Sequence, residues 1–287
     1  GGGNFLRGGS LAEAGMNHNN DLSLGKELID AAITTGCDAI KFQTFLPNSR
    51  VSSKFKSVDF VEMADGIEET MHEMFSRLAM PFDDQKKLFE YAQDKGIEVF
   101  STPFDFESVD FLESLGVNIY KIASMDLVNL PLIEYVAKTQ KPIILSTGMS
   151  NLGMIEDSLN VIAKTGNSNV ALLHCNSTYP AAAKDMNLEA IKTLKKCFNL
   201  PVGLSDHTFG LLVSTVALSI GANIVERHFT MSKTLEGPDH ILSSEPEEMR
   251  QLVEISKTIN DILGDGVKRV KTSEYDTINL QQKSLYA

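Results

Sequence analysis

Short apolar runs with the composition of β-strands recur along the whole chain, and each ends in a polar residue of a kind that takes part in catalysis or binding. Amphipathic stretches of about ten to fifteen residues separate the runs, which is the pattern of βα units. Eight runs are present, and we expect strands near 11–15, 38–43, 97–102, 117–122, 142–146, 169–175, 201–204 and 222–228. The chain is therefore predicted to be an α/β protein, a TIM (β/α)₈ barrel whose strand ends converge on one face.

Glycines mark the ends of several connecting helices. The helices predicted at 22–35, 83–95 and 151–165 are followed by Gly36, Gly96 and Gly166. Glycine is preferred there because it adopts the left-handed conformation that closes a helix. The 287 residues, of which 43% are hydrophobic, suffice for one such barrel with a large core.

Composition argues against several classes of protein. No run approaches the roughly 18 apolar residues of a membrane span, and the N-terminus lacks a secretory pattern, so we expect a cytoplasmic protein with no membrane partner. The formal net charge of −12 argues against nucleic acid as a partner, although an anion could still bind in a locally basic pocket. Cys37, Cys175 and Cys197 are widely spaced and are expected to be reduced thiols.

We place the barrel at 11–265, with an insertion at 46–81 and one further segment at each end of the chain. Residues 1–10 are glycine-rich and are interpreted as a cloning remnant or a discontinuous piece of a longer N-terminus. An insertion at 46–81 contains the helical segment MHEMFSRLAM, which is apolar enough to pack on another surface as a lid or an interface element. Residues 266–287 are polar and are predicted to form a tail.

Two histidines give the sharpest chemical signal. His207 and His228 lie at the ends of adjacent predicted strands, which run about 4.8 Å apart, so both imidazoles could reach one metal ion. Two protein ligands leave room for water and substrate oxygens, which suits Mn²⁺ or Mg²⁺ acting as a Lewis acid, and imidazole ligands favour Mn²⁺. The alternative is a pair of hydrogen-bonded histidines without a metal.

Lysines and hydroxyl groups at the strand ends predict an anion site. Lys41 and Lys121 end two strands that we expect on opposite sides of the barrel, and a buried ammonium group is costly unless an anion meets it. The surrounding hydroxyls would come from Thr102, Ser124, Ser146, Ser177 and Ser205. A lysine Schiff base is the competing chemistry, which the many donors and the predicted metal disfavour. No motif for a nucleotide cofactor is present.

Carboxylates at the barrel mouth are candidates for proton transfer or for hydrogen-bonding polyol hydroxyls. They are Glu13, Asp126, Glu226 and Asp239. For Glu226 a second interpretation stays open, in which it faces the barrel core beside Arg227.

Eight ordered motifs carry a family resemblance: AEAGMNHNND, CDAIKFQTF, STPFDFESVDFL, YKIASMDLVNLPLI, KPIILSTGMS, LLHCNSTYPA, GLSDHT, and VERHFT with GPDH. Together they resemble the sialic acid synthase family, which makes N-acetylneuraminate and the related legionaminate and pseudaminate. The resemblance covers nearly all of residues 11–287. It implies a TIM barrel that condenses phosphoenolpyruvate with an N-acetylmannosamine-like aldehyde and releases phosphate. It also implies a divalent metal, Mn²⁺ first with Mg²⁺ and Co²⁺ as alternatives, and a homodimer.

The resemblance also implies a role for each strand-end residue. His207 and His228 would bind the metal and act in catalysis together with Glu13, Lys41 and Lys121. Phosphoenolpyruvate would be held by Lys41, Thr102, Lys121, Ser124, Ser146, Ser177 and Ser205. Glu13 and Asp239 would contact the open-chain sugar and its acylamino group, and Asp126 and Tyr179 would complete the substrate-binding set.

The chain departs from the family pattern at three places. Asp126 stands where a glutamate is frequent, so its carboxylate reaches less far, and Ser177 stands where some members have asparagine. The final QQKSLYA resembles the junction at which the family's small C-terminal antifreeze-like domain begins. That domain would reach the partner subunit's site and supply an arginine to the sugar. Without it, sugar affinity would suffer while phosphoenolpyruvate and metal binding persist.

Two alternative functions stay open. The sugar could be a diacetamido-trideoxyhexose, which would make the chain a legionaminate or pseudaminate synthase. The LVNLPLI and NSTYPA motifs look closer to the neuraminate and legionaminate branches. The chain could instead be a non-catalytic barrel in surface or spore-coat polysaccharide assembly, which the many costly polar groups at one face disfavour.

Overall fold

Eight parallel strands form a closed barrel in the computed structural model, which describes residues 9–50, 60–62 and 68–283. The strands pair in the order β1-β10-β9-β8-β7-β6-β5-β2. Their bounds are β1 Gly9–Gly15, β2 Ala39–Thr44, β5 Glu98–Pro103, β6 Tyr120–Ile122, β7 Ile143–Ser146, β8 Val170–Cys175, β9 Val202–Asp206 and β10 Ile224–His228. The predicted TIM barrel is confirmed, with β1 beginning at Gly9, two residues before the predicted edge.

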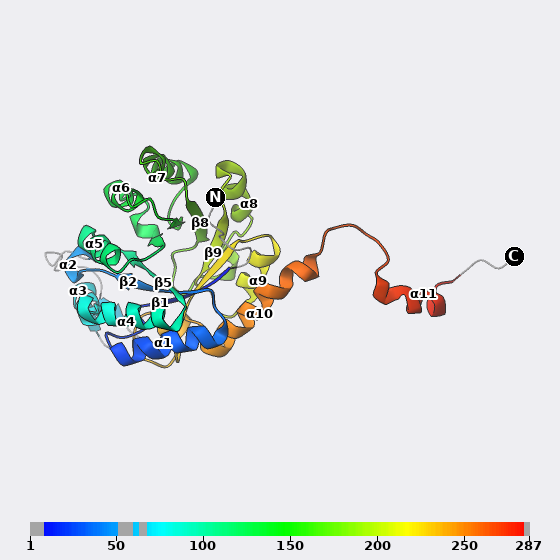
Figure 1. Cartoon of the computed structure of the whole chain (residues 1–287), viewed down its shortest axis with the longest axis horizontal. Coiled ribbons are helices and arrows are strands. Elements are labelled where there is room, and N and C mark those ends of the chain that lie inside the picture. The colour runs from blue at the N-terminus through cyan, green and yellow to red at the C-terminus, as the bar shows by residue number, and fades with distance from the viewer. Residues whose placement is uncertain (1–8, 51–59, 63–67, 284–287) are drawn as a thin grey trace.

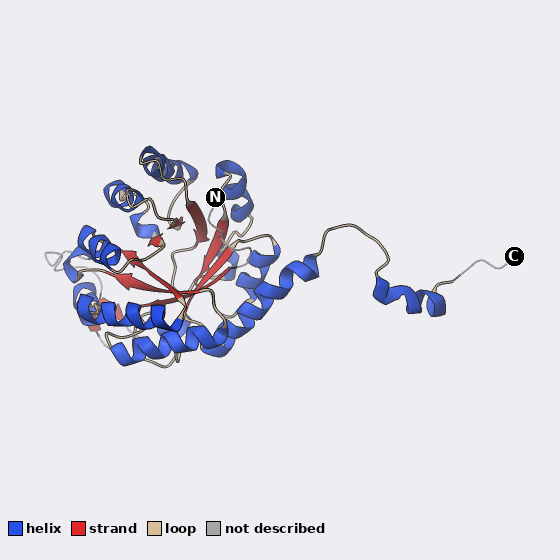
Figure 2. Ribbon diagram, viewed as in Figure 1, coloured by secondary structure: helices blue, strands red, loops and turns tan. Residues whose placement is uncertain are grey.

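Helices surround the barrel, as Figure 2 shows. They are α1 Leu22–Thr35, α4 Phe82–Lys95, α5 Phe106–Ser114, α6 Leu130–Ala137, α7 Leu152–Lys164, α8 Ala190–Phe198, α9 Leu212–Ser219 and α10 Pro246–Leu263. Local sequence sets their ends. Asp21 caps α1 by accepting from the backbone of Ser23 and Leu24, and Gly36 closes it with a φ of 78°, a conformation that glycine adopts without strain.

The barrel interior has an apolar floor and a polar top. Near the N-terminal ends of the strands the inward side chains are apolar: Leu11, Phe100, Ile144, Ala171, Leu173 and Ile224. One step further along β1, β2 and β10 the inward positions carry Glu13, Lys41 and Glu226, because every second residue of a strand faces the same side. The fold therefore brings the polar strand ends together above a packed floor.

Gly203 lets β9 and β10 approach closely within the barrel wall. A Cβ atom on Gly203 would lie 2.2 Å from the backbone oxygen of Ile224 and 2.8 Å from Leu173. A larger residue would therefore displace β10, the strand that carries Glu226 and His228.

The insertion after β2 packs against the carboxyl face of the barrel. It contains α2 Pro47–Arg50, the antiparallel strands β3 Phe60–Glu62 and β4 Glu68–Thr70, and α3 Met71–Leu78. The predicted helix in MHEMFSRLAM is confirmed, and it buries Met74, Phe75 and Leu78 against Phe45 and Phe104. Positions 51–59 and 63–67 of the predicted insertion lie outside the described residues.

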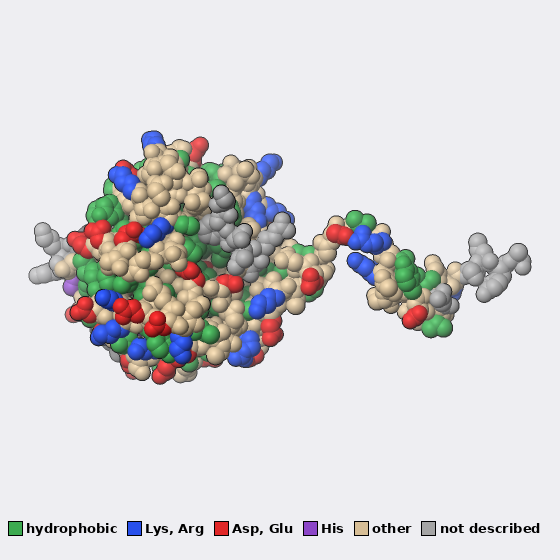
Figure 3. Space-filling view, in the orientation of Figure 1, with side chains coloured by type: hydrophobic (Ala, Val, Ile, Leu, Met, Phe, Trp, Pro, Cys, Tyr) green, Lys and Arg blue, Asp and Glu red, His purple; other side chains and the backbone are tan. Residues whose placement is uncertain are grey.

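The C-terminal tail leaves the barrel after α10, as Figure 1 shows. It contains the short helix η4 Thr272–Glu274 and the helix α11 Tyr275–Gln281, and its described side chains are largely exposed. Residues 1–8 and 284–287 of the predicted terminal segments lie outside the described part. On the face seen in Figure 3, basic and acidic side chains are interspersed over the barrel. None of the helices in the described ranges is long and apolar enough to cross a membrane.

Candidate active site

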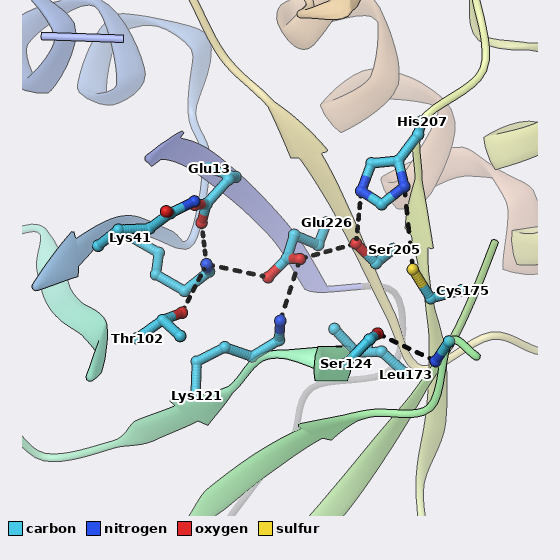
Figure 4. Close-up of polar contacts among 12 residues, drawn as sticks. Glu13, Lys41, Thr102, Lys121, Ser124, Leu173, Cys175, Ser205, His207 and Glu226 are labelled. Atoms are coloured by element: carbon cyan, nitrogen blue, oxygen red, sulfur yellow. Dashed lines mark hydrogen bonds and ion pairs between the residues drawn. The ribbon is translucent and has the colours of Figure 1, made fainter. Parts of the chain in front are cut away.

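Two lysines and two glutamates form a buried ionic cluster above the barrel floor (Figure 4). The ammonium group of Lys41 pairs with the Glu13 carboxylate and lies 3.7 Å from Glu226 Oε2. Lys121 Nζ lies 3.3 Å from Glu226 Oε1. Each of these side chains is at most 5% exposed, so the charges are balanced within the cluster and not by water.

The order of the strands explains how one glutamate serves both lysines. Lys41 on β2 and Lys121 on β6 are separated by β5 alone, so the prediction that they lie on opposite sides of the barrel is wrong. Thr102 on the intervening β5 accepts a hydrogen bond of 3.1 Å from Lys41 Nζ. Ser205 on β9 donates to Glu226 Oε1 over 2.8 Å. Glu226 thus faces the site, whereas Arg227 faces outward and pairs with Asp206.

Burial and the lysines set the protonation of the two glutamates differently. For Glu226, burial opposes ionisation, but Lys121 and Lys41 outweigh it and hold the pKa at about 2. For Glu13, burial dominates and raises the pKa, although Lys41 opposes this shift. Burial also lowers the pKa of Lys121, against the attraction of Glu226. Glu226 is therefore expected to stay ionised, and Glu13 is the group better suited to exchange a proton.

The predicted hydroxyl donors line the mouth beside the cluster. Ser146 Oγ and Ser177 Oγ are buried without a hydrogen-bond partner among the described residues. Ser124, in η1 Ser124–Asp126, accepts from the backbone of Gly148 over 3.0 Å. A Cβ atom on Gly148 would lie 2.3 Å from Ser177 Oγ and 2.8 Å from Ser124 Oγ, so glycine keeps these hydroxyls accessible. Unpartnered buried hydroxyls at one mouth are suited to an anion.

The two predicted metal ligands lie side by side. The ring centroids of His207 and His228 are 5.4 Å apart. His207 Nδ1 donates to the backbone oxygen of Asn176 over 2.8 Å, so Nε2 carries the lone pair, and the Ser205 hydroxyl lies 3.5 Å from it. His228 Nδ1 is buried with no hydrogen-bond partner among the described residues, and Asp239 Oδ2 lies 3.8 Å from it.

The histidines therefore fit a metal site with two imidazole ligands. Burial lowers the pKa of His228, although Asp239 opposes this, so the neutral ligand form is favoured. In the described ranges no group of three or more His, Cys, Asp or Glu residues is arranged to hold a metal ion. The remaining positions of a bound metal would accordingly fall to water and substrate oxygens, as an open catalytic site requires.

A cavity of about 660 Å³ adjoins the cluster and is lined by several of the predicted substrate and metal residues. Ser124, Ser177, Tyr179, His228 and Asp239 line it. The Tyr179 ring lies 4.2 Å from that of His207, between centroids. The carboxylate of Asp126 lies beside this region and keeps Oδ2 buried and unpartnered among the described residues. Another cavity, of about 740 Å³, is lined by α7 and α8 and contains none of the lysines or glutamates of the cluster.

Four residues at the site were not predicted to lie there. Gln43 donates to Glu13 Oε1 over 3.1 Å, and Arg50 lines the cavity. Cys175 Sγ and the backbone of Asn176 both contact His207 Nδ1. Gln43 could have been found, because it lies two residues after Lys41 and so faces the same side of β2.

Comparisons with known proteins identify the family of the chain. The model of the NeuB family matches residues 28–268. The N,N'-diacetyllegionaminic acid synthase of Campylobacter jejuni is 44% identical over 279 residues, which are 96% of this chain and 84% of that protein. The pseudaminic acid synthase of Helicobacter pylori is 33% identical, over 96% of this chain and 81% of that protein.

A solved structure is similar over the whole barrel. The crystal structure of N-acetylneuraminic acid (sialic acid) synthetase from Leptospira borgpetersenii serovar Hardjo-bovis in complex with citrate superposes with a TM-score of 0.83. It is 35% identical in sequence, and the match covers 95% of this chain and 90% of that one. The family match and these relatives show that the chain belongs to the NeuB family.

Proposed function

We propose that this chain condenses phosphoenolpyruvate with a diacetamido-trideoxyhexose to form a legionaminate-type nonulosonic acid and inorganic phosphate. The condensation of phosphoenolpyruvate with an amino sugar follows from membership of the family. The observation that carries it is the placement of Lys41 and Lys121 beside the His207 and His228 pair at one barrel mouth. That mouth offers an anion site and a metal site to two substrates at once.

Phosphoenolpyruvate would bind at the ionic cluster. Before it binds, Glu13 and Glu226 hold the two ammonium groups in position. The carboxylate and phosphate of the substrate would then take donors from Lys41, Thr102, Lys121, Ser124, Ser146, Ser177 and Ser205. Fixed donors in a site shielded from water stabilise charge more strongly than water does, because they need no reorganisation.

The sugar would bind in the adjoining cavity. A Mn²⁺ ion held by His207 and His228 would polarise the aldehyde. Tyr179 and Asp239 line the same cavity and would position the open chain of the sugar, and Asp126 would bind it from beside the cavity. Holding the aldehyde carbon close to C3 of phosphoenolpyruvate converts an encounter between two molecules into a reaction within one complex.

The chain's own residues would then guide the reaction. As C3 of phosphoenolpyruvate attacks the aldehyde, positive charge develops at C2, and the carboxylate of Glu226 would stabilise it. Glu13 would accept a proton from the water that adds at C2 and pass it to the alkoxide oxygen left by the aldehyde, which becomes the new hydroxyl. Lys41 and Lys121 would stabilise the phosphate as the C–O bond breaks, and the released group would be inorganic phosphate.

The choice of sugar rests on degrees of similarity. Identity to the legionaminic acid synthase is 44%, and identity to the pseudaminic acid synthase is 33%. N-acetylmannosamine and the pseudaminate precursor are therefore the competing sugars. We also propose a cytoplasmic homodimer. Exposed apolar side chains on loops and helix starts at the carboxyl face support an interface there: Met125, Val128, Met149, Leu152, Phe209 and Leu212.

Phosphate release from phosphoenolpyruvate with Mn²⁺ tests the function. Each candidate sugar and a no-sugar control would be assayed with the wild type, His207→Ala and His72→Ala. His72 is a half-buried histidine on α3 whose Nε2 lies 2.9 Å from Asn48 Oδ1, and it serves as the matched control.

Three outcomes separate the alternatives. Release that requires the diacetamido sugar and His207 but not His72 supports the proposal. Release with a different sugar shows that this other sugar is the substrate. No release with any sugar, although phosphoenolpyruvate and Mn²⁺ bind by calorimetry, supports a non-catalytic barrel.

A further inference from the structure

Arg50 is a cation at the active-site cavity that the proposed chemistry does not use. It is the last residue of α2, just beyond β2, the strand that carries Lys41. Its side chain lines the cavity of about 660 Å³ together with Gln43, His228 and Asp239. Arg50 therefore faces the space assigned to the sugar.

Three aromatic rings hold the guanidinium group of Arg50 in place. Its Cζ atom lies 3.6 Å from the centroid of Phe104, 4.3 Å from that of Phe75 and 5.2 Å from that of Phe45. A guanidinium group stacks on aromatic faces through cation–π attraction, which fixes the planar fork without using its N–H groups. The position of Arg50 is thus set by contacts that leave its hydrogen-bond donors free.

Two of these donors are unpartnered in the part of the chain that the structure describes. Nε and Nη1 of Arg50 are buried and have no hydrogen-bond partner among the described residues. Arg227 shows the opposite arrangement, because its Nε, Nη1 and Nη2 donate to Ser244, Asp206 and Thr208 over 2.7, 2.7 and 2.8 Å. Buried donors without partners are costly and are expected where a ligand supplies the acceptor.

The surroundings of Arg50 favour a neutral acceptor over a second phosphate. The carboxylates of Asp126 and Asp239 are close enough to act on the charge of Arg50. A dianion beside them would be repelled, whereas an amide carbonyl carries no net charge. Gln43 adds an acceptor, because its Nε2 donates to Glu13 and its Oε1 is buried without a partner in the described part of the chain.

The walls near Arg50 suit a methyl group. The cavity is lined there by Met16, Met71, Met74, Phe75 and Phe104. Methionine and phenylalanine side chains pack against small apolar groups and do not compete for the donors. The cavity therefore offers donors, an acceptor and an apolar wall, the three features that an acetamido group requires.

We propose that Arg50 is a specificity-determining residue that binds the carbonyl oxygen of the sugar's second acetamido group. Nε and Nη1 donate to that oxygen, the methyl group packs on the methionine and phenylalanine wall, and Gln43 accepts from a donor of the sugar. This inference rests on the proposed function, since it concerns the substrate of the same site. It distinguishes a diacetamido-trideoxyhexose from N-acetylmannosamine, which lacks the second acetamido group.

Kinetics of the full chain with two sugars test the role of Arg50. Wild type, Arg50→Met, Arg50→Lys and Arg250→Met are assayed with the diacetamido sugar and with N-acetylmannosamine, with Mn²⁺ and saturating phosphoenolpyruvate. We expect Arg50→Met to raise the KM of the diacetamido sugar about 10- to 100-fold, the effect of losing hydrogen bonds from a charged donor. The KM of phosphoenolpyruvate and that of N-acetylmannosamine should change less than about threefold.

The other variants separate specificity from structure. Arg50→Lys keeps the charge but loses the planar fork, so it should recover only part of the affinity. Arg250, an exposed residue of α10 paired with Glu247, should behave as the wild type when changed to methionine. Equal losses for both sugars, or a lower melting temperature of Arg50→Met with unchanged sugar selectivity, would overturn the proposal.

Direct binding keeps this test independent of turnover. Calorimetry with the diacetamido sugar alone measures its affinity for wild type and Arg50→Met without phosphoenolpyruvate. If the wild type releases no phosphate with any sugar, the proposed function fails. In that case, weaker binding of the diacetamido sugar by Arg50→Met than by the wild type would still support the proposal for Arg50. Equal affinity of the two proteins would refute it.

Discussion

The two faces of strands β9 and β10 carry equally buried polar residues that are arranged in opposite ways. Asp206 and Arg227 face outward, away from the barrel interior, and form an ion pair of 2.7 Å with side chains at most 2% exposed. Ser205, Glu226 and His228 alternate with them and face the barrel mouth. One residue along the chain thus separates a structural network from a chemical one.

The outward network is saturated with hydrogen bonds. Asp206 accepts from Arg227, from Ser214 over 2.5 Å and from Thr208, and the remaining donors of Arg227 reach Thr208 and Ser244. On the inward face, Glu226 Oε2 and His228 Nδ1 have no hydrogen-bond partner among the described residues. Buried polar groups whose hydrogen bonds are all made hold the strands together, whereas buried polar groups without a partner are suited to bind a ligand. The outward pair therefore links β9 and β10 next to His207 and His228.

The largest expected effect comes from breaking the outward pair. Arg227→Met leaves the Asp206 carboxylate buried without its counter-ion, so the free energy of unfolding should fall by about 3–5 kcal/mol. Urea denaturation followed by circular dichroism measures the change. Arg250→Met, which removes a similar side chain from an exposed pair with Glu247, should cost less than about 1 kcal/mol. Similar losses in both variants would contradict a structural role for the outward pair.

An inward change should affect activity more than folding. Lys121→Met removes a donor to the proposed phosphoenolpyruvate site, so kcat/KM for phosphoenolpyruvate should fall about 10²- to 10³-fold. Glu226 keeps Lys41 and Ser205 as partners, so we expect a smaller loss of stability than in Arg227→Met. Initial rates of phosphate release and urea denaturation give the two values. Lys184→Met, at an exposed position, is the control, and unchanged kinetics in Lys121→Met would refute the anion site.

A third substitution should increase the separation of β9 and β10 without changing a polar side chain. Gly203→Ala places a Cβ atom 2.2 Å from the Ile224 oxygen, and such overpacking lowers the free energy of unfolding by about 1–3 kcal/mol. Displacement of β10 should also weaken Mn²⁺ binding, which titration calorimetry measures. Gly153→Ala, in α7 where the nearest atom is 3.4 Å away, should be neutral or slightly stabilising. Wild-type stability of Gly203→Ala would show that β10 adjusts freely.

Strand periodicity predicted most of this arrangement, and its failures have physical causes. Eight apolar runs with polar ends predicted the barrel, and the positions of Lys41, Thr102 and Glu13 followed from the convergence of strand ends. The prediction that Lys41 and Lys121 lie on opposite sides of the barrel was wrong. Strands in a barrel follow one another in sequence order, which places a single strand, β5, between β2 and β6. Because alternate residues of a strand face the same side, the position of Lys41 on β2 would also have predicted Gln43 at the site.

Arg50 could not be predicted in the same way. It lies in an insertion, where no strand period fixes the direction of a side chain, and its role depends on rings from three distant segments. Phe45, Phe75 and Phe104 meet only because α3 folds over the ends of β2 and β5. Contacts of this kind arise from tertiary packing, which the local sequence does not encode.

The smallest predicted effect concerns His18, a buried histidine that is satisfied within the protein. Its Nδ1 accepts from the backbone of Asn20 over 3.0 Å, and burial lowers its pKa to about 4. The ordinary pKa of histidine is about 6.5, so between these values the unfolded chain binds a proton that the folded chain does not. The free energy of unfolding should therefore fall by about 1 kcal/mol from pH 7 to pH 5.5 on account of this residue.

The variant His18→Asn isolates that contribution from the pH dependence of the other groups. Urea denaturation of wild type and variant at pH 7 and pH 5.5 should show a smaller decrease in the variant, because asparagine does not titrate. Equal decreases would mean that His18 binds its proton in the folded state. A smaller decrease would show that burial keeps His18 neutral, and burial also lowers the pKa of His228. The two histidines then differ as the two faces of β9 and β10 do: His18 Nδ1 accepts from a backbone donor, whereas His228 Nδ1 has no hydrogen-bond partner among the described residues.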